Sequence, residues 1–366
     1  MIYLDHGATS FPKLPQVRRA VEKAMQTCAN PGRGGYGPAM EAAKQIFTCR
    51  SRAAKLFCCR EDQVVFTGNC THGLNIAINT LVKPGDRVVV SGFEHNAVTR
   101  PLHAREARIS VAGRRLFSRE DTLEEFARLL PGAAAAVFTH VSNVFGYILP
   151  VEEMAALCRE KGVPFIVDAA QSAGTIPVSL EKLGAAFIAM PGHKGLLGPQ
   201  GTGILLCARE AQPLLQGGTG SESVRQDMPD DLPERLEAGT VNVPGIAGLS
   251  AGLEYLLKTG VEKIGCRERR QRKRCAVGLE NLGFRVFTGP DQGGTVSFIP
   301  GIDCEEAAQR MAGLGFALRA GLHCAPLAHE SAGTLETGTV RVSFGHDADD
   351  RQTDLFLQAA AKGITK

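Results

Sequence analysis

Residues 165–171 read Phe165-Ile-Val-Asp168-Ala-Ala-Gln171, a short apolar run that ends on a carboxylate and continues to an amide. A run rich in Val and Ile, without alternating polar side chains, is typical of a strand covered on both faces of a parallel sheet. An aspartate directly after such a strand is costly to bury unless a cationic group lies beside it. This stretch therefore predicts an α/β fold with a charged site at the carboxyl end of a buried strand.

Similar apolar runs precede and follow this one, and the segments between them have helical spacing. The predicted strands are Gln63–Phe66, Arg87–Val90, Ala134–Thr139, Phe165–Val167, Ala186–Ala189 and Gly203–Leu206. The predicted helices between them include Leu74–Leu81, Leu123–Leu130 and Val151–Lys161. Because strands alternate with helices, we expect a mainly parallel sheet with helices on both faces.

The pattern changes near Gly239, where long helices and then short mixed elements begin. The predicted elements are helices at Ile246–Lys258, Val261–Leu282, after the cap residue Asp303 and from about Asp349, with strands at Thr295–Ile299, Ala317–Arg319 and Val340–Ser343. This pattern indicates a smaller α+β unit. We expect an N-terminal segment (1–14) that packs with the small domain, a large domain (15–245) and a small C-terminal domain (246–366). The loop Gly217–Pro233 is predicted to be a long, mobile connection.

The composition is that of an ordinary globular protein. Of 366 residues, 44% are hydrophobic and 22% are charged, and the net charge is only +3, which gives no general attraction to nucleic acid or anionic membranes. There is no apolar run long enough to span a bilayer and no secretory signal at Met1, so we expect a soluble, cytoplasmic protein. The eleven cysteines are odd in number and irregularly spaced, which predicts reduced thiols rather than disulfides or a zinc site.

Three further segments place polar groups at the end of a predicted strand or the start of a loop. They are Phe66-Thr-Gly-Asn-Cys-Thr-His-Gly-Leu74, Phe93-Glu94-His95-Asn96 and Pro191-Gly-His193-Lys194-Gly. In the first, Gly68 permits a tight turn before a helix that begins near Thr71, so that free backbone amides and the Thr71 hydroxyl form a phosphate cradle. The second segment puts an imidazole just beyond a strand. In the third, small neighbours let a planar cofactor approach Lys194, and burial lowers the pKa of its amine.

Together these groups predict a pyridoxal phosphate site. The cofactor needs a lysine for its aldehyde, an acid beside its pyridine nitrogen, a phosphate cradle and a flat group over its ring. Lys194, Asp168, the Gly68–His72 turn and His95 supply these in turn. Four such groups at one edge of one sheet form a coherent site, whereas each alone has an ordinary structural explanation.

Several motifs also resemble those of a known family along essentially the whole chain. They are Tyr3-Leu-Asp-His-Gly-Ala-Thr-Ser, Glu94-His95-Asn-Ala, Ser142-Asn143-Val-Phe-Gly, Val167-Asp168-Ala-Ala-Gln171, Gly192-His193-Lys194, Glu237-Ala-Gly-Thr240, Arg319-Ala-Gly-Leu-His323-Cys324-Ala and Arg341-Val-Ser-Phe. In this order the chain resembles the class V aminotransferase-fold cysteine desulfurases, especially the group II (SufS-like) and selenocysteine lyase branch. The resemblance implies a homodimeric fold-type I enzyme with a seven-stranded type of sheet, which uses pyridoxal 5'-phosphate to convert L-cysteine to L-alanine.

The resemblance also implies a role for individual residues. Around the cofactor, Lys194 would bond to the aldehyde, Asp168 would pair with the pyridine nitrogen, Gln171 would contact the ring hydroxyl oxygen, His95 would stack on the ring and Asn143 would lie beside ring and substrate. Thr71, His72 and His193 would hold the phosphate, with Thr240 reaching in from the other subunit. Arg341 would bind the substrate carboxylate, near Gly7 and Ala8, and Cys324 would be the nucleophile. The persulfide would pass to a thiol acceptor such as a small sulfur-carrier protein.

The chemistry independently favours Cys324. Removing sulfur from cysteine needs a nucleophile that attacks sulfur and retains it, and a thiolate does both. We expect Cys324 on a loop, beside Arg319 and His323, that can swing over the cofactor. The short segment between Cys324 and the strand at Val340 fits the group II pattern better than the long cysteine loop of group I.

Some positions depart from the family pattern. They are His6-Gly7, His72, Pro191, Leu322 and His346-Asp347. Proline offers neither a hydroxyl nor an N–H, so we expect one phosphate contact to be lost at Pro191. The other departures bear on substrate preference and rate, because they spare Lys194, Asp168, Cys324 and Arg341.

The sequence also permits other functional interpretations. The nearest are a selenocysteine lyase, or another class V reaction such as that of a transaminase, an epimerase or a β-lyase. A non-enzymatic alternative is a scaffolding protein that binds nucleic acid through Arg267, Arg269, Arg270, Arg272, Lys273 and Arg274, although such a run is more typical of a solvated helix face. The segment Gly32-Arg-Gly34-Gly-Tyr-Gly37 matches a dinucleotide-binding pattern but follows no predicted strand.

Overall fold

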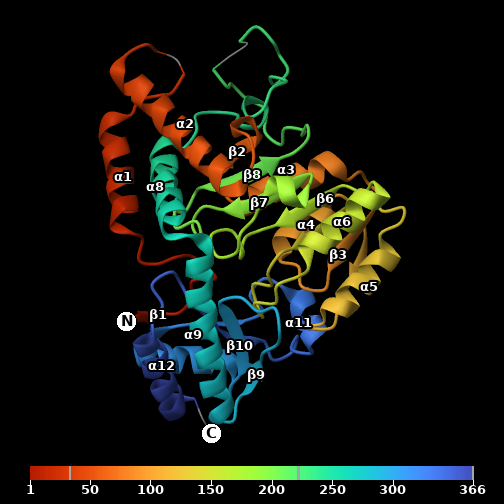
Figure 1. The fold of residues 1–366 in the computed structure, drawn as a ribbon, viewed down its shortest axis with the longest axis vertical. Helices are drawn as coiled ribbons and strands as arrows, with labels where there is room; N and C mark the ends of the chain where they lie inside the picture. The colour runs from red at the N-terminus through yellow and green to blue at the C-terminus, as the bar shows by residue number, and fades with distance from the viewer. Residues whose placement is uncertain (33, 221–222, 365–366) are drawn as a thin grey trace.

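A seven-stranded sheet forms the centre of the larger part of the chain in the computed structural model, which describes residues 1–32, 34–220 and 223–364 (Figure 1). Its strand order is β2-β8-β7-β6-β5-β3-β4. The strands are β2 (Val64–Thr67), β3 (Arg87–Ser91), β4 (Arg108–Ala112), β5 (Ala135–Thr139), β6 (Phe165–Asp168), β7 (Phe187–Pro191) and β8 (Gly203–Cys207). Only β8 runs antiparallel to its neighbours within this sheet, so the predicted mainly parallel α/β sheet is confirmed.

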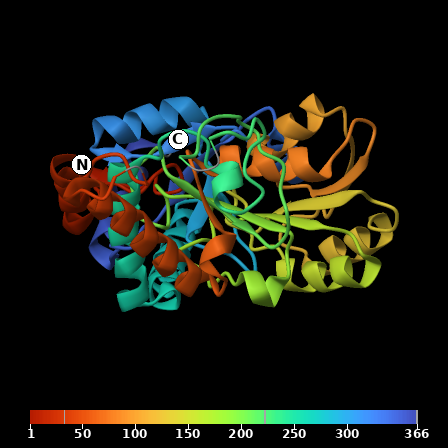
Figure 2. The same ribbon diagram turned by 90° about the horizontal axis from the view of Figure 1, so that it is seen from above.

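Helices cover both faces of this sheet, because alternate strand residues point to opposite sides. Ile166 packs beneath α3 (Cys70–Leu81) and α4 (Asn96–Ala104), while Val167 packs on the face of α5 (Arg119–Leu129) and α6 (Val151–Lys161). Figure 2 shows the two helical layers on either side of the strands. The short helix α7 (Leu180–Leu183) lies against α6. A hydrophobic core fills the space between the sheet and the helices on each of its two faces.

The sequence reasoning missed strand β4. It reads Arg-Ile-Ser-Val-Ala, lies at the edge of the sheet beside β3, and its first two residues are exposed. An edge strand is covered less completely than a central one, so it lacks the continuous apolar run that marked the other strands.

The smaller part of the chain is built on a four-stranded antiparallel sheet of order β12-β13-β10-β9. Its strands are β9 (Arg285–Phe287), β10 (Thr295–Ile299), β12 (Arg319–Gly321) and β13 (Thr339–Ser343), and its helices are α9 (Val261–Asn281), α10 (Cys304–Gly313), α11 (Pro326–Ala332) and α12 (Asp350–Gly363). The single strand predicted at Ala317–Arg319 is wrong in detail. The chain changes partner at Leu318: β11 (Phe316–Ala317) pairs with the N-terminal strand β1 (Ile2–Tyr3), and β12 pairs with β13.

Three long helices pack together at one end of the large sheet: α1 (Pro15–Thr27), α2 (Gly37–Phe57) and α8 (Val243–Thr259). Helix α8 begins three residues before the predicted Ile246, where Asn242 caps it by accepting the Gly245 N–H. Figure 1 shows α8 beside α1 and α2 and the following α9 beside α12. The division into 1–14, 15–245 and 246–366 stays a prediction.

Three further observations concern the whole chain. None of the helices among the described residues is both long and apolar enough to cross a membrane. All eleven cysteines are free thiols. The predicted loop Gly217–Pro233 includes residues 221–222, and the glycine-rich segment before α2 includes Arg33, which lie outside the described residues.

Candidate active site

Four loops that follow strands of the large sheet meet around one cavity of about 230 Å³. Asp168 ends β6, His95 follows β3, Asn143 follows β5 and Lys194 follows β7. The cavity is lined by these residues and by Asn69, Cys70, Thr71, Ala97, Thr139, Ala170, Gln171, Pro191 and His193. Most of the residues predicted for the cofactor are therefore brought together at the carboxyl ends of neighbouring strands.

Asp168 is buried, with only 2% of its surface exposed. Its carboxylate accepts a hydrogen bond from the Ala170 N–H at 2.9 Å and from the Cys70 thiol at 3.4 Å. Burial, followed by the charge of Asp168, raises the pKa of Cys70 well above its ordinary value, so this thiol stays protonated and donates. Cys70 is a site residue that sequence reasoning missed, because its contact with Asp168 depends on where α3 lies over β6.

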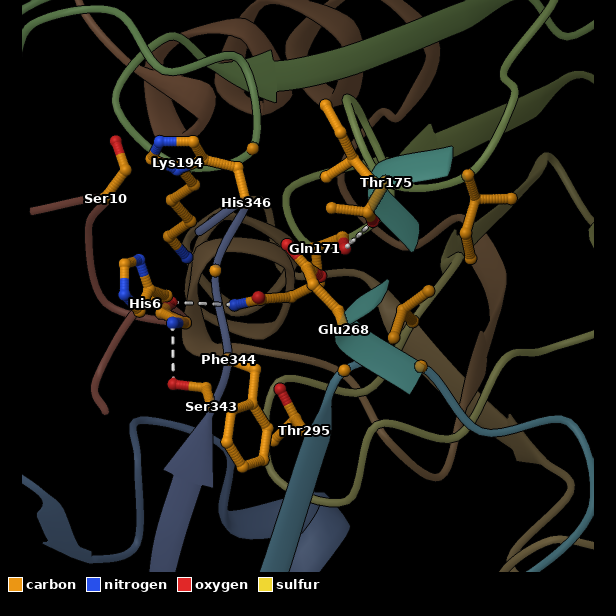
Figure 3. A pocket seen from close by; sticks show the side chains of 18 of the residues that line it. His6, Ser10, Gln171, Thr175, Lys194, Glu268, Thr295, Ser343, Phe344 and His346 are labelled. Atoms are coloured by element: carbon orange, nitrogen blue, oxygen red, sulfur yellow. Dashed lines mark hydrogen bonds between the residues drawn. The ribbon is translucent and has the colours of Figure 1, made fainter. Parts of the chain in front are cut away.

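Lys194 lies between this cavity and a second, smaller one of about 50 Å³. In Figure 3 its side chain extends into the smaller cavity toward Gln171 and His6. Burial and the Arg341 guanidinium lower the pKa of Lys194, whereas Asp168 acts in the opposite direction. A lowered pKa makes the neutral, nucleophilic form of the amine more accessible near neutral pH.

The glycines around Lys194 are required by close backbone approaches. A Cβ on Gly195 would lie 2.3 Å from the Ala173 carbonyl oxygen, and one on Gly192 would lie 2.0 Å from the Thr202 hydroxyl. Any side chain at either position would displace the loop that carries the lysine. The glycine-rich setting predicted from the sequence thus holds Lys194 in place.

The N-terminus of α3 lines one end of the cavity. Asn69 caps this helix by accepting the His72 N–H at 2.9 Å, and Thr71 in the first turn is exposed. Gly68 has open space where a Cβ would be. Free amides at a helix N-terminus with an exposed hydroxyl fit a phosphate.

Two histidines predicted to contact the phosphate are neutral at physiological pH. Burial lowers the pKa of His193 to about 4 and also lowers that of His72. His193 Nδ1 lies 3.1 Å from the Thr9 hydroxyl, and Lys13 Nζ donates to the His193 carbonyl at 2.9 Å. Of the predicted set, Thr240 is exposed and does not line this cavity in its own chain.

His95 is held as the N-cap of α4. Its Nδ1 accepts the Ala97 N–H at 2.9 Å, so the ring proton is on Nε2, and burial lowers its pKa. The preceding Glu94 is fully buried and accepts the Thr139 N–H at 2.8 Å, which ties β3 to β5. Burial raises the pKa of Glu94 to about 8. The Glu94-His95 motif thus combines a structural carboxyl with a ring that faces the cavity.

Arg341 on β13 is almost completely buried and already paired. One guanidinium nitrogen lies 2.5 Å from an oxygen of Asp5, and the other donates to the Asn143 carbonyl at 3.0 Å. The Nε–H has no hydrogen-bond partner among the described residues. Sequence reasoning missed Asp5 as a partner, although the motif Tyr3-Leu-Asp contains it.

The N-terminal segment packs directly on Arg341. A Cβ on Gly7 would lie 3.2 Å from the Arg341 Cζ, the Gly7 N–H donates to the Ser343 hydroxyl at 2.8 Å, and Ala8 follows it in the same turn. Gln171 Nε2 donates to the Gly7 carbonyl at 3.0 Å, an interaction drawn in Figure 3. This contact joins Gln171, predicted for the cofactor, to Gly7, predicted for the substrate.

Cys324 lies in the short turn between β12 and α11, and it is exposed. Arg319 Nη2 lies 3.8 Å from its Sγ. Its backbone carbonyl accepts the Asn96 N–H at 2.8 Å, and the preceding carbonyl of His323 accepts from Asn143 Nδ2 at 2.8 Å. The turn is therefore fastened to the two loops that carry His95 and Asn143.

Two departures from the family pattern meet in space. His6 and His346 both line the smaller cavity, and in each case only 9% of the side chain is exposed. The Asp347 carboxylate lies 4.0 Å from His6 Nε2 and 3.8 Å from His346 Nδ1. His6-Gly7 and His346-Asp347 thus form one cluster beside Lys194 (Figure 3).

Two arginines of the cluster on α9 form ion pairs within their own chain, and a third contacts a backbone carbonyl. Arg270 pairs with Asp350 and Arg274 with Asp354, both at 2.7 Å. Arg267 donates to the His346 carbonyl at 2.6 Å. These contacts favour the interpretation of this run as a helix face over that of a nucleic-acid surface.

Comparison with known proteins gives a consistent family relationship. The aminotransferase class-V model matches residues 2–356. A probable cysteine desulfurase of Methanothermobacter thermautotrophicus is 33% identical over 93% of this chain and 89% of its own. One of Pyrococcus abyssi is 33% identical over 98% and 92%. A structure of a cysteine desulfurase from Thermococcus onnurineus superposes with a TM-score of 0.90 at 30% identity, covering 99% of this chain and 94% of that one.

Proposed function

The chain belongs to the aminotransferase class-V family, and we propose that it is a cysteine desulfurase that uses pyridoxal 5'-phosphate to convert L-cysteine to L-alanine with a persulfide left on Cys324. The observation that carries the proposal is the meeting of two kinds of group. The buried Asp168 and the half-buried Lys194 share one cavity, and an exposed thiol is fastened to the loops around it. A transaminase needs the first kind of group but not the second.

The residues present fit the cofactor. Asp168 supplies a buried carboxylate, Lys194 an amine of lowered pKa, and the α3 N-terminus an open anion cradle, all around one cavity. When bound, pyridoxal phosphate supplies an aldehyde for the amino group and a ring that draws electrons from the amino acid. We assign its contacts to Lys194, Asp168, Gln171, His95, Asn143, Thr71, His72 and His193, with Thr240 from a second subunit.

The residues of the chain then share the work on the substrate. Arg341 binds the carboxylate next to Gly7 and Ala8, and its Nε–H is the donor that no described residue already uses. The Lys194 amine takes the proton from the α-carbon. His95, which lines the cavity and whose Nδ1 is held by the Ala97 N–H, covers the ring.

Cys324 takes the sulfur. Its thiolate forms a bond to the substrate sulfur while the bond between that sulfur and the β-carbon breaks, and the carbon keeps the electron pair and is protonated to the methyl group of alanine. Overall, L-cysteine and one enzyme thiol give L-alanine and one enzyme persulfide. A thiol acceptor then receives the terminal sulfur and restores the Cys324 thiol.

The setting of the enzyme follows from the same chemistry. We propose a homodimer, because the exposed Thr240 lies outside the cavity of its own chain. A persulfide and eleven free thiols are suited to the reducing cytoplasm, with a small sulfur-carrier protein as acceptor. The short segment between Cys324 and β13 supports a place in the group II branch.

A comparison of two cysteine variants tests the proposal. Formation of alanine from L-cysteine should collapse in Cys324→Ala, while the cofactor absorbance of the protein is unchanged. The matched control is Cys266→Ala, which removes another exposed thiol, on α9, and should retain full activity. If Cys324→Ala makes alanine at the rate of the unmodified enzyme, the protein is not a desulfurase of this kind.

A further inference from the structure

The turn that carries Cys324 adopts a conformation that must be held by its surroundings. His323 and Cys324 both have positive φ angles, 49° and 58°. Two consecutive residues with a Cβ in the left-handed region are unusual, because this region is disfavoured for side chains other than glycine. Such a turn persists only where neighbouring groups fix it.

Hydrogen bonds from the large part of the chain fix the backbone of this turn. Asn143 Nδ2 donates to the His323 carbonyl and the Asn96 N–H donates to the Cys324 carbonyl, both at 2.8 Å. On the other side, His323 Nε2 lies 3.1 Å from the Thr339 carbonyl. The nucleophile is thus held from both parts of the molecule, which differs from the swinging loop expected from the sequence.

The donor on the large part has a specific position. Asn96 is the first residue of α4, and its N–H is one of the amides that a helix leaves without an internal partner. The next free amide, that of Ala97, binds the ring of His95 at 2.9 Å. One turn of helix therefore holds both the imidazole predicted to cover the cofactor ring and the backbone of the nucleophile.

We propose that the backbone N–H of Asn96 is a positioning group for sulfur transfer, which fixes the position of the Cys324 backbone relative to His95. The proposal rests on the proposed function, since it assumes that Cys324 receives the sulfur. In this proposal, the first turn of α4 fixes the distance between His95 and Cys324, which come from different parts of the chain. The side chain of Asn96 is not needed for this task.

The substitution Asn96→Pro removes this one donor with little disturbance of the helix. Proline has no N–H, and it is well tolerated at the first position of a helix. The residue before a proline must be extended, and His95 already has φ −78° and ψ 155°. The ring of proline also pushes the Cys324 carbonyl away. Asn96→Ala is the matched control, because it loses the same side chain, including the contact with the Thr99 hydroxyl, but keeps the N–H.

We expect Asn96→Pro to lower kcat for alanine formation roughly tenfold to a hundredfold, since small misplacements of reacting groups have effects of this size. KM for L-cysteine and the cofactor absorbance should not change. Exchange of the α-hydrogen of L-alanine in D2O, which needs Lys194 but not Cys324, should continue. Asn96→Ala should match the unmodified enzyme in all of these.

The outcomes separate the two proposals. If the unmodified enzyme makes no alanine from cysteine, the proposed function fails. If it does, and Asn96→Pro is as active as Asn96→Ala, the positioning role is wrong. A measurement on the unmodified holoenzyme guards against misfolding of the variant: the Asn96 amide should exchange with solvent as slowly as the helical Val98 amide, which binds the His95 carbonyl at 2.9 Å. Fast exchange at Asn96 would overturn the proposal.

Discussion

At the scale of single residues, several side chains of the candidate site contact groups that are far away in the sequence. Asp168 could be predicted, because an acid after a buried strand is visible in the chain itself. The Cys70 thiol on its carboxylate and the Asp5 carboxylate on Arg341 could not, since each contact joins separate elements. The local sequence pattern reveals which residue carries a charge, whereas the fold decides which group that charge contacts.

The Asp5–Arg341 pair leads to a prediction about stability. Asp5→Asn leaves the guanidinium of Arg341, only 1% exposed, with a neutral partner, and we expect a loss of about 1–3 kcal/mol in the free energy of unfolding. A substrate carboxylate should restore an anionic partner, so L-alanine should raise the melting temperature more in the variant than in the unmodified holoenzyme. The measurement is thermal unfolding with and without L-alanine.

A surface pair provides the control for this prediction. Arg60 and Asp62 form an ion pair in which both side chains are more than half exposed, so Asp62→Asn should leave the melting temperature nearly unchanged. Equal effects of L-alanine on Asp5→Asn and on the unmodified protein would show that Arg341 does not bind the carboxylate of the ligand.

At the scale of elements, the covered strands of the large sheet were visible in the sequence, including the buried edge strand β2, and the exposed edge strand β4 was not. The covered strands β5, β6 and β8 have continuous apolar runs, whereas the edge strand β4 is half exposed and was missed. The boundaries of β11 and β12 were also missed. The chain pairs with a different strand on each side of Leu318, and this change does not alter the pattern of hydrophobic residues. Periodicity reports how an element is covered, but not which strand lies beside it.

One carboxylate joins three elements of the large part. Glu237, after the short 3₁₀ turn η2 (Glu234–Leu236), accepts the Phe66 N–H of β2 at 2.7 Å and pairs with Arg50 of α2 at 2.9 Å. It begins the segment that leads to Thr240, so the pair also anchors the residue proposed to act in the second subunit.

We expect Glu237→Gln to destabilise the fold by about 3–5 kcal/mol, because it leaves the charge of Arg50 buried without its counterion. Its control is Glu254→Gln, which breaks the pair with Arg52 on the same helix α2. That pair is about one third exposed, so the change should stay within about 1 kcal/mol. The measurement is the midpoint of urea unfolding, and similar midpoints for the two variants would contradict the structural role of Glu237.

At the scale of the whole molecule, the site lies where the two sheets meet. Lys194 and Asp168 come from the seven-stranded sheet, while Arg341 and Cys324 come from the four-stranded sheet and the turn beside it. The N-terminal segment crosses between them, since β1 pairs with β11 and Ser10 donates to the His193 carbonyl. The arrangement places the residues proposed for the cofactor on the large sheet and the proposed nucleophile beside the smaller sheet.

Mass spectrometry of the Cys324 peptide tests the central claim most directly. After brief incubation of the holoenzyme with L-cysteine and alkylation of free thiols, this peptide should gain the mass of one sulfur atom. The gain should be absent in Lys194→Ala, and absent from the other exposed cysteines, Cys58 and Cys266. Alanine formed with no sulfur on Cys324, or sulfur found on another cysteine instead, would contradict the account.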